Sequence, residues 1–196
     1  MAAALVLAAR GHAVTVLEAQ PVSGGKLRQV DVAGQAQDAG PTVFTMRWVF
    51  EELFACAGEN LADCLRLRRA DLLARHTWND QSRLDLHADT GRNEDAIGVF
   101  AGPTQARLYR QFRIDARRTY QTLEHAFLRA TRPNPVSLAW RVGLRGLPGL
   151  ARMAPFHTLW EALGRYFPDP RLRQLFGRYA TYCGSSPFQA SATTLG

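Results

Sequence analysis

The sequence predicts an α/β fold at its N-terminal end, and two patterns near the start of the chain carry this prediction. Residues 2–10 are rich in alanine and leucine and are followed by Gly11, which is typical of a helix and its end. Residues 13–17 form a short apolar run with β-branched side chains, which favours a parallel strand buried on both faces. A helix that leads into such a strand is the repeating step of α/β folds.

The acid that follows this strand indicates a particular kind of α/β domain. In a Rossmann-type unit the second strand ends in Asp or Glu, whose carboxylate binds ribose hydroxyls about 20 residues after a glycine-rich phosphate loop. Glu18 holds that position, and counting back places the loop at or just before Met1. We therefore expect an incomplete Rossmann-type domain, with the first strand and the glycine loop missing. Taken alone, Glu18 fits a solvated strand-end acid equally well.

Two glycine turns strengthen the prediction of a cofactor site. The segment SGGKLR (23–28) places a cation directly after a Gly-Gly pair, so backbone amides and a positive charge can approach a phosphate together. The segment QDAGPT (37–42) sets a second tight turn about one hairpin later. The candidate cofactor-binding residues are therefore Glu18, Gly24, Gly25, Lys26, Gly40, Pro41 and Thr42.

The remaining elements divide the chain into two parts. Residues 27–32 and Gly34 predict a hairpin, and residues 46–58 predict a helix that ends at a glycine. Segments 65–78 and 82–89 are predicted as strands joined by a turn. The chain is predicted to be helical from about residue 90, with Pro103 in the first turn of a long helix.

These elements suggest two incomplete domains. We assign residues 1–64 to part of a cofactor-binding domain. We assign residues 65–196 to part of a mixed, largely helical substrate-binding domain.

Composition and residue spacing exclude several classes of function. The net charge of +7 raises the possibility of a nucleic-acid partner, but the arginines are spread along the chain and Lys26 is its one lysine, so we expect no nucleic acid. The five histidines occur singly, without a partner at metal-ligand or dyad spacing. We therefore predict no metal and assign no catalytic residue. No apolar run approaches the roughly 20 residues that a membrane-spanning helix needs.

Residues 14–54 resemble the N-terminal FAD-binding region of the carotenoid (phytoene-type) desaturases, flavoproteins related to the amine oxidases. Within this family, the 1-hydroxycarotenoid 3,4-desaturases, also called methoxyneurosporene dehydrogenases, are the most similar to two segments of the chain. These segments are DAGPTVFTMRWVFEELF and, downstream, LFGRYATYCGSSPF. The resemblance runs through nearly the whole chain, which is similar to only the first part of such an enzyme. It implies an N- and C-terminally incomplete member of this family.

The resemblance implies FAD as the cofactor and a role for each candidate residue. Glu18 matches the acid that binds the adenosine ribose. The Gly24-Gly25-Lys26 motif matches the residues beside the FAD diphosphate. Arginine is more common at the position of Lys26; lysine keeps the positive charge but cannot form the two parallel hydrogen bonds of a guanidinium group. The Gly40-Pro41-Thr42 turn matches the segment that runs toward the flavin and the substrate cavity.

The resemblance also implies an activity and a location. The intact protein is expected to desaturate an acyclic carotenoid by hydride transfer from an allylic carbon to the flavin, whereas this chain alone is expected to be inactive. Since the substrate is apolar, we expect a cytoplasmic protein peripherally associated with the inner membrane. Residues 136–167 mix aromatic side chains with arginines, as an interfacial helix pair does, although a core-packed helix pair with basic outer faces fits the same pattern.

Two alternatives remain open from the residues. One is another enzyme of the flavin amine-oxidase superfamily. The other is a non-catalytic truncated protein that acts as a membrane-surface or interaction module, suggested by the missing phosphate loop.

Overall fold

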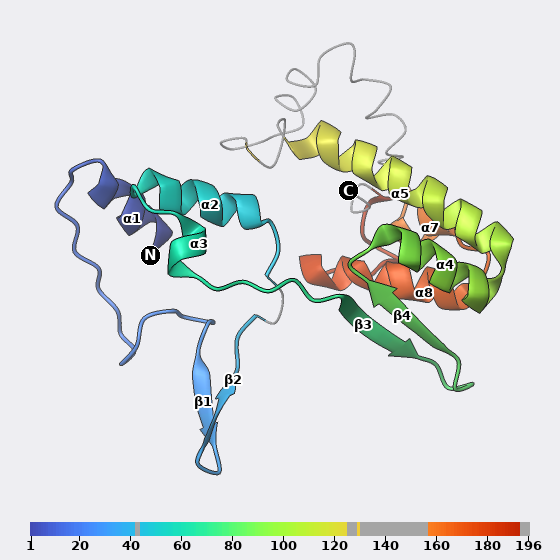
Figure 1. Cartoon of the computed structure of the whole chain (residues 1–196), viewed down its shortest axis with the longest axis horizontal. Helices are drawn as coiled ribbons and strands as arrows, with labels where there is room; N and C mark the ends of the chain where they lie inside the picture. The colour runs from blue at the N-terminus through green and yellow to red at the C-terminus, as the bar shows by residue number, and fades with distance from the viewer. Residues whose placement is uncertain (42–43, 125–128, 130–156, 193–196) are drawn as a thin grey trace. The chain divides into compact units, whose positions relative to one another are not determined.

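The computed structural model describes residues 1–41, 44–124, 129 and 157–192. The chain forms two compact units, Met1–Arg69 and Ala70–Gly196 (Figure 1). The division predicted between residues 64 and 65 concerned binding roles, and it stays a prediction.

The first unit begins with helix α1, Ala2–Ala9, where the sequence predicted a helix. Gly11 has a φ of +83° and its N–H donates to the carbonyl of Ala8 at 2.9 Å, so the glycine ends the helix in a left-handed conformation. None of the residues of α1 is buried, although the helix is almost wholly apolar. Its apolar surface therefore remains exposed.

The strand predicted over residues 13–17 is not present, so that prediction is wrong for this structure. These residues belong to no helix or strand. Instead of being buried on both faces, Val16 and Leu17 are 53% and 91% exposed. A β-strand exists only where a neighbour accepts and donates its backbone hydrogen bonds, and no described strand pairs with this run.

The predicted hairpin is confirmed. Strands β1, Gln29–Val32, and β2, Gln35–Asp38, pair antiparallel with Val32 opposite Gln35. The two residues between them, Ala33 and Gly34, both have positive φ angles, 53° and 80°, as a type I′ turn requires.

Two further helices complete the first unit. Helix α2, Arg47–Cys56, lies where a helix was predicted, and Gly58 follows it with a φ of +80°. Helix α3, Leu61–Cys64, is a single short turn, and α2 contacts both α1 and α3. Among the described residues of this unit, Leu61 is the one buried hydrophobic side chain. The unit therefore has almost no core of its own.

The second unit begins with a two-stranded antiparallel sheet of β3, Leu72–Thr77, and β4, Arg83–His87. In β4 Leu84 and Leu86 are buried and their neighbours are not, which is the alternation of a strand with one face on a core. The predicted pair of strands is confirmed from residue 72 onward. Residues 65–70, which were predicted as the start of the first strand, form neither strand nor helix.

Helices follow the sheet, as the sequence predicted. Helix α4, Thr90–Ala101, starts at Asp89, whose carboxylate accepts from the N–H of Arg92 at 2.8 Å. Gly102 joins it to α5, Pro103–Leu123, in which the proline occupies the first turn. The described residues near the C-terminus form α7, Leu159–Gly164, α8, Pro170–Gly177, and the 3₁₀ helix η2, Arg178–Cys183.

The core of the second unit is apolar and rich in aromatic rings. The face of β4 packs against α4, and Ile97 on that helix is fully buried. Phe167 is also fully buried and stacks on Phe176 with ring centroids 4.6 Å apart. Rings from α5, α8 and the chain between α7 and α8 thus close one continuous cluster.

The predicted interfacial helix pair at residues 136–167 lies mostly outside the described residues. Within the part of the chain that the structure describes, no helix combines the length and apolar character needed to cross a membrane.

Candidate functional site

A pocket of about 510 Å³ in the first unit brings four of the seven predicted cofactor-binding residues together. It lies where the 23–28 segment meets the end of the β1–β2 hairpin. Its lining comes from both glycine turns and consists of Gly25, Lys26, Arg28, Ala39, Gly40 and Pro41. The two glycine turns, which were predicted separately from the sequence, therefore form one concave surface.

Glycine is required where the first turn bends. The N–H of Leu27 donates to the carbonyl of Gly24 at 3.1 Å, and the φ angles of Gly24 and Gly25 are +131° and +61°. Other L-residues rarely adopt such values. A Cβ atom on Gly24 would also lie 2.5 Å from the carbonyl oxygen of Leu27. The Gly-Gly pair is therefore what allows the chain to turn and present Lys26.

The second turn is held against the first by backbone contact. The N–H of Ala39 donates to the carbonyl of Arg28 at 2.9 Å. A Cβ on Gly40 would stand 2.8 Å from the Lys26 carbonyl oxygen and 3.0 Å from the Leu27 Cα. Only a residue without a side chain fits at this distance, so Gly40 allows the two turns to meet.

The pocket has a cationic lining. Lys26 and Arg28 both line it, and its described lining includes no acidic residue. Within the described part of the chain, neither cation makes an ion pair or a side-chain hydrogen bond. Two uncompensated positive charges at one concave surface favour an anionic ligand. Sequence reasoning missed Arg28, although its position two residues after Lys26 was visible.

Three predicted residues are not part of this lining. Gly24 allows the first turn to bend but does not line the pocket. Glu18 is exposed and accepts a hydrogen bond from the N–H of Gln20 at 2.9 Å, which stabilises its own loop. Thr42 lies outside the described residues. The assignment of all seven residues to a cofactor stays a prediction.

Among the described residues of the second unit lie two pockets that were not predicted from the sequence. One, of about 540 Å³, lies between the β3–β4 turn and α8; the other, of about 520 Å³, lies beside Trp160 and Phe188. Both are lined by Arg171, Gln174 and Arg178. The three side chains recur at helical spacing along α8 and η2, so they share one face.

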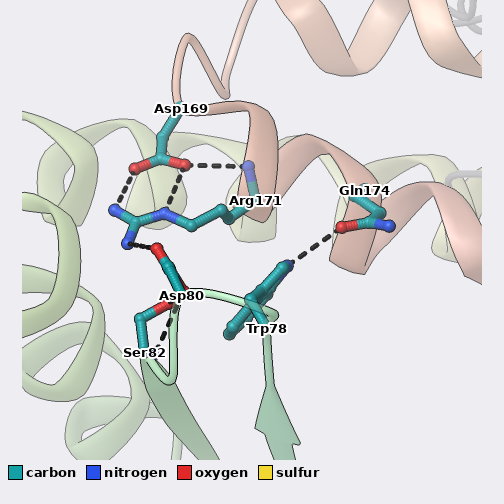
Figure 2. A network of polar contacts seen from close by, with 6 residues as sticks. All are labelled: Trp78, Asp80, Ser82, Asp169, Arg171 and Gln174. Atoms are coloured by element: carbon teal, nitrogen blue, oxygen red, sulfur yellow. Dashed lines mark hydrogen bonds and ion pairs between the residues drawn. The ribbon is translucent and has the colours of Figure 1, made fainter.

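A polar network fixes the wall of the first of these pockets (Figure 2). Arg171 donates to both carboxylate oxygens of Asp169, at 3.2 and 2.8 Å, and lies 3.7 Å from Asp80 at the hairpin tip. The indole N–H of Trp78 donates to the Gln174 side chain at 2.9 Å. The network thus connects the β3–β4 turn to α8. Asp169 and Asp80 balance the positive charge of Arg171 within the network.

His76 lines the same pocket with an unsatisfied ring nitrogen. Its Nε2 atom is buried and has no hydrogen-bond partner in the part of the chain that the structure describes. Burial, and then the nearby positive charge of Arg178, lower the pKa of His76 below its ordinary value. The lowered pKa favours the neutral form of the side chain. Among the described residues, no group of three or more His, Cys, Asp or Glu side chains could hold a metal ion.

The chain is similar to a group of carotenoid-modifying enzymes. It is 48% identical over its whole length to hydroxyneurosporene desaturase of Rubrivivax gelatinosus, of which it covers 37%. It is 41% identical to hydroxyneurosporene desaturase of Cereibacter sphaeroides over 97% of the chain and 38% of that protein. It is 38% identical to phytoene dehydrogenase of Streptomyces griseus over 98% of the chain and 37% of that protein.

The chain thus spans little more than a third of the length of the curated relatives it matches. Residues 1–181 match the family described as flavin containing amine oxidoreductase. That match covers far more than half of the sequence and implies a flavin cofactor. The chain belongs to the family of flavin containing amine oxidoreductases.

Proposed function

We propose that this chain is part of an FAD-dependent carotenoid desaturase and that it supplies a portion of the FAD site. The observation that carries the proposal is the convergence of Gly25, Lys26, Gly40 and Pro41 on one cationic pocket. The 48% identity to a hydroxyneurosporene desaturase supports the same reading.

The residues of the pocket fit the diphosphate of FAD. Gly40 allows the second turn to pack against the backbone of the first, and Lys26 lines the pocket without an acidic partner among the described residues. A diphosphate carries the negative charge that such a lining attracts, and backbone close to a glycine can approach phosphate oxygens.

Glu18 is proposed to bind the adenosine ribose. Its carboxylate accepts one hydrogen bond, from Gln20, and an ionised carboxylate has about four acceptor positions. Ribose hydroxyls can therefore bind without displacing Gln20. This role belongs to a Rossmann-like FAD domain, a finer assignment than family membership alone, and it is part of the proposal.

In this proposal the chemistry is divided between cofactor and protein. When bound, FAD supplies the hydride acceptor for oxidation of a carbon–carbon single bond beside a polyene. The residues of the pocket bind and orient the cofactor: Lys26 offsets phosphate charge, and Gly40 allows the two turns that form the lining to meet. We assign no residue of this chain to proton removal from the substrate.

The proposed substrate is an acyclic carotenoid, as the names of the relatives suggest. Because such a substrate is held in a lipid bilayer, we propose that the whole protein acts at the cytoplasmic surface of the inner membrane. The net charge of +7 favours attraction to anionic lipids, and the spread of the arginines along the chain argues against a nucleic-acid partner.

A chimera tests this function. The segment of the Rubrivivax gelatinosus relative that matches this chain is replaced by residues 1–196, and the chimera is produced in cells that accumulate hydroxyneurosporene. We expect the purified chimera to retain FAD and the cells to contain a desaturated product. The 196-residue chain alone, whose first unit buries little apolar surface, is expected to retain no flavin.

The result separates the alternatives. A folded chimera without flavin would contradict the FAD assignment, and a flavin-loaded chimera that converts no carotenoid would indicate another reaction of the same family. Retention of flavin by the isolated chain would contradict the expectation that it is incomplete as a cofactor site. The Glu18→Ala chimera should bind FAD more weakly, while Glu59→Ala, at an exposed acid of the same unit, should not.

A further inference from the structure

Arg28 lines the same pocket as Lys26. The two residues are separated by Leu27 in the sequence. Arg28 is exposed, and neither cation has an acidic partner in the described part of the chain. Two such charges would repel each other at short range unless an anion lies between them or beside both.

The backbone of Arg28 is fixed relative to the second glycine turn. Its carbonyl accepts the N–H of Ala39 at 2.9 Å, one residue before Gly40. The residue also stands directly before β1, whose ladder begins with Gln29 opposite Asp38. The Cα atom of Arg28 is therefore held by the hairpin, whereas Lys26 is placed by the Gly24–Leu27 turn. The backbones of the two cations are thus fixed by different contacts of the two connected turns.

The two side chains differ in what they can offer an anion. Lys26 provides a compact point charge, and it is the only lysine in the chain. Arginine provides a planar guanidinium whose N–H groups can donate to two phosphate oxygens together. A ligand with two adjacent phosphoryl groups has enough oxygens and charge for both side chains.

We propose that Arg28 is a diphosphate-binding residue and that, with Lys26, it forms a two-cation clamp in which Arg28 supplies the bidentate fork. The identity of the diphosphate as that of FAD rests on the proposed function; the clamp itself does not. The shared chemistry is a diphosphate group, whether carried by a dinucleotide or present as free pyrophosphate.

The first arm of the test uses inorganic pyrophosphate and the 196-residue chain. Amide NMR signals of Gly25 and Gly40 report on the pocket, and the signal of Gly34, at the far end of the hairpin, reports that the hairpin is intact. The variants are Arg28→Gln, Arg28→Lys and, as a matched control, Arg66→Gln, an exposed arginine of the same unit outside the pocket.

We expect pyrophosphate to shift the Gly25 and Gly40 signals. Arg28→Gln should weaken binding about tenfold, since a charge-assisted pair of hydrogen bonds is lost. Arg28→Lys should recover part of the affinity because it keeps the charge but not the fork. Arg66→Gln should bind like the unsubstituted chain. Absence of shifts in the unsubstituted chain, or equal binding by Arg28→Gln, would overturn the clamp.

The second arm measures FAD affinity in the chimera with the relative. Weaker FAD binding by the Arg28→Gln chimera, with Arg66→Gln unchanged, supports the clamp in the cofactor site. If FAD binds equally to both variants, the clamp is wrong although the proposed function stands. If the chain binds pyrophosphate through Arg28 but the chimera takes up no FAD, the clamp stands and the FAD assignment fails.

Discussion

Gly40 lies so close to Lys26 that a Cβ atom on the glycine would stand 2.8 Å from the Lys26 carbonyl oxygen. This contact joins two segments that are 14 residues apart and forms the wall of the cationic pocket. We predict that Gly40→Ala separates the two turns and lowers the FAD affinity of the chimera by at least about tenfold, a change of about 1.4 kcal/mol.

Gly34→Ala is the matched control for this prediction. Gly34 has a φ of +80°, so alanine is strained there by about 1 kcal/mol, but no atom lies within 4 Å of its Cβ position. The control should destabilise the hairpin slightly and leave FAD affinity within about threefold. Flavin titration of both chimeras measures the difference. Equal affinities would show that the contact between Gly40 and Lys26 does not shape the site.

Local sequence signals predicted the local features of the fold. Gly34 predicted a hairpin because a two-residue turn needs positive φ angles, and Pro103 predicted a helix start because its ring fits the first turn. The buried positions Leu84 and Leu86 follow from the alternation of β4. In each case the physical cause lies within a few residues of the signal.

Features that depend on distant partners could not be predicted in the same way. The run at residues 13–17 has the composition of a buried strand but no described neighbour to pair with, so Val16 and Leu17 are exposed. The position of Arg28 beside the second glycine turn depends on a backbone hydrogen bond from Ala39, which no spacing rule reveals. The hydrogen bond from Trp78 to Gln174 joins residues 96 positions apart.

The hydroxyl of Tyr166 donates to a carboxylate oxygen of Asp115 at 3.0 Å. This pair makes the free energy of unfolding vary with pH in the alkaline range. Burial, and then the negative charge of Asp115, raise the pKa of Tyr166 to about 12. Because the folded-state pKa lies above the ordinary value of 10.0, this stabilisation is complete below pH 10 and is lost as the pH rises to 12.

We expect the unsubstituted chain to lose about 1–2 kcal/mol more unfolding free energy than Tyr166→Phe across this window, a figure reduced for partial solvent exposure of the hydroxyl. Urea unfolding of both proteins at a series of pH values measures the difference. Tyr182→Phe, at a tyrosine that is 62% exposed, serves as the control and should follow the unsubstituted chain. Parallel pH curves for Tyr166→Phe and the unsubstituted chain would contradict the assignment.

Arg173 clamps the start of α7 through three contacts with Trp160. Its Nε and Nη2 atoms donate to the Trp160 carbonyl at 2.9 and 2.7 Å, and its guanidinium carbon lies 4.3 Å from the centre of the indole ring. Arg173→Lys keeps the charge but loses the forked geometry, so it should destabilise the second unit by about 1–2 kcal/mol.

Arg165→Lys, at an exposed arginine one residue after α7, should change stability by less than about 0.5 kcal/mol. Thermal unfolding followed by near-ultraviolet circular dichroism reports on the tryptophan environment in both variants. A midpoint for Arg173→Lys equal to that of Arg165→Lys would show that the fork contributes nothing to stability.

Phe167 holds the aromatic core of the second unit together. Its side chain is fully buried, it stacks on Phe176, and its ring meets that of Phe112 edge-on with centroids 5.1 Å apart. Phe167→Ala removes a large ring from a closed cluster and leaves a cavity, so it should destabilise the unit by about 3–5 kcal/mol. Phe167→Leu fills most of that space and should cost less than half as much.

Tyr182→Ala provides the comparison for this core variant, because it removes a ring of similar size from an exposed site and should cost less than about 0.5 kcal/mol. Urea unfolding curves give the free energies for the three variants. Since the first unit buries little apolar surface, the main unfolding transition should report on the second unit. A loss for Phe167→Ala as small as that for Tyr182→Ala would mean that the stability of this unit does not depend on its aromatic cluster.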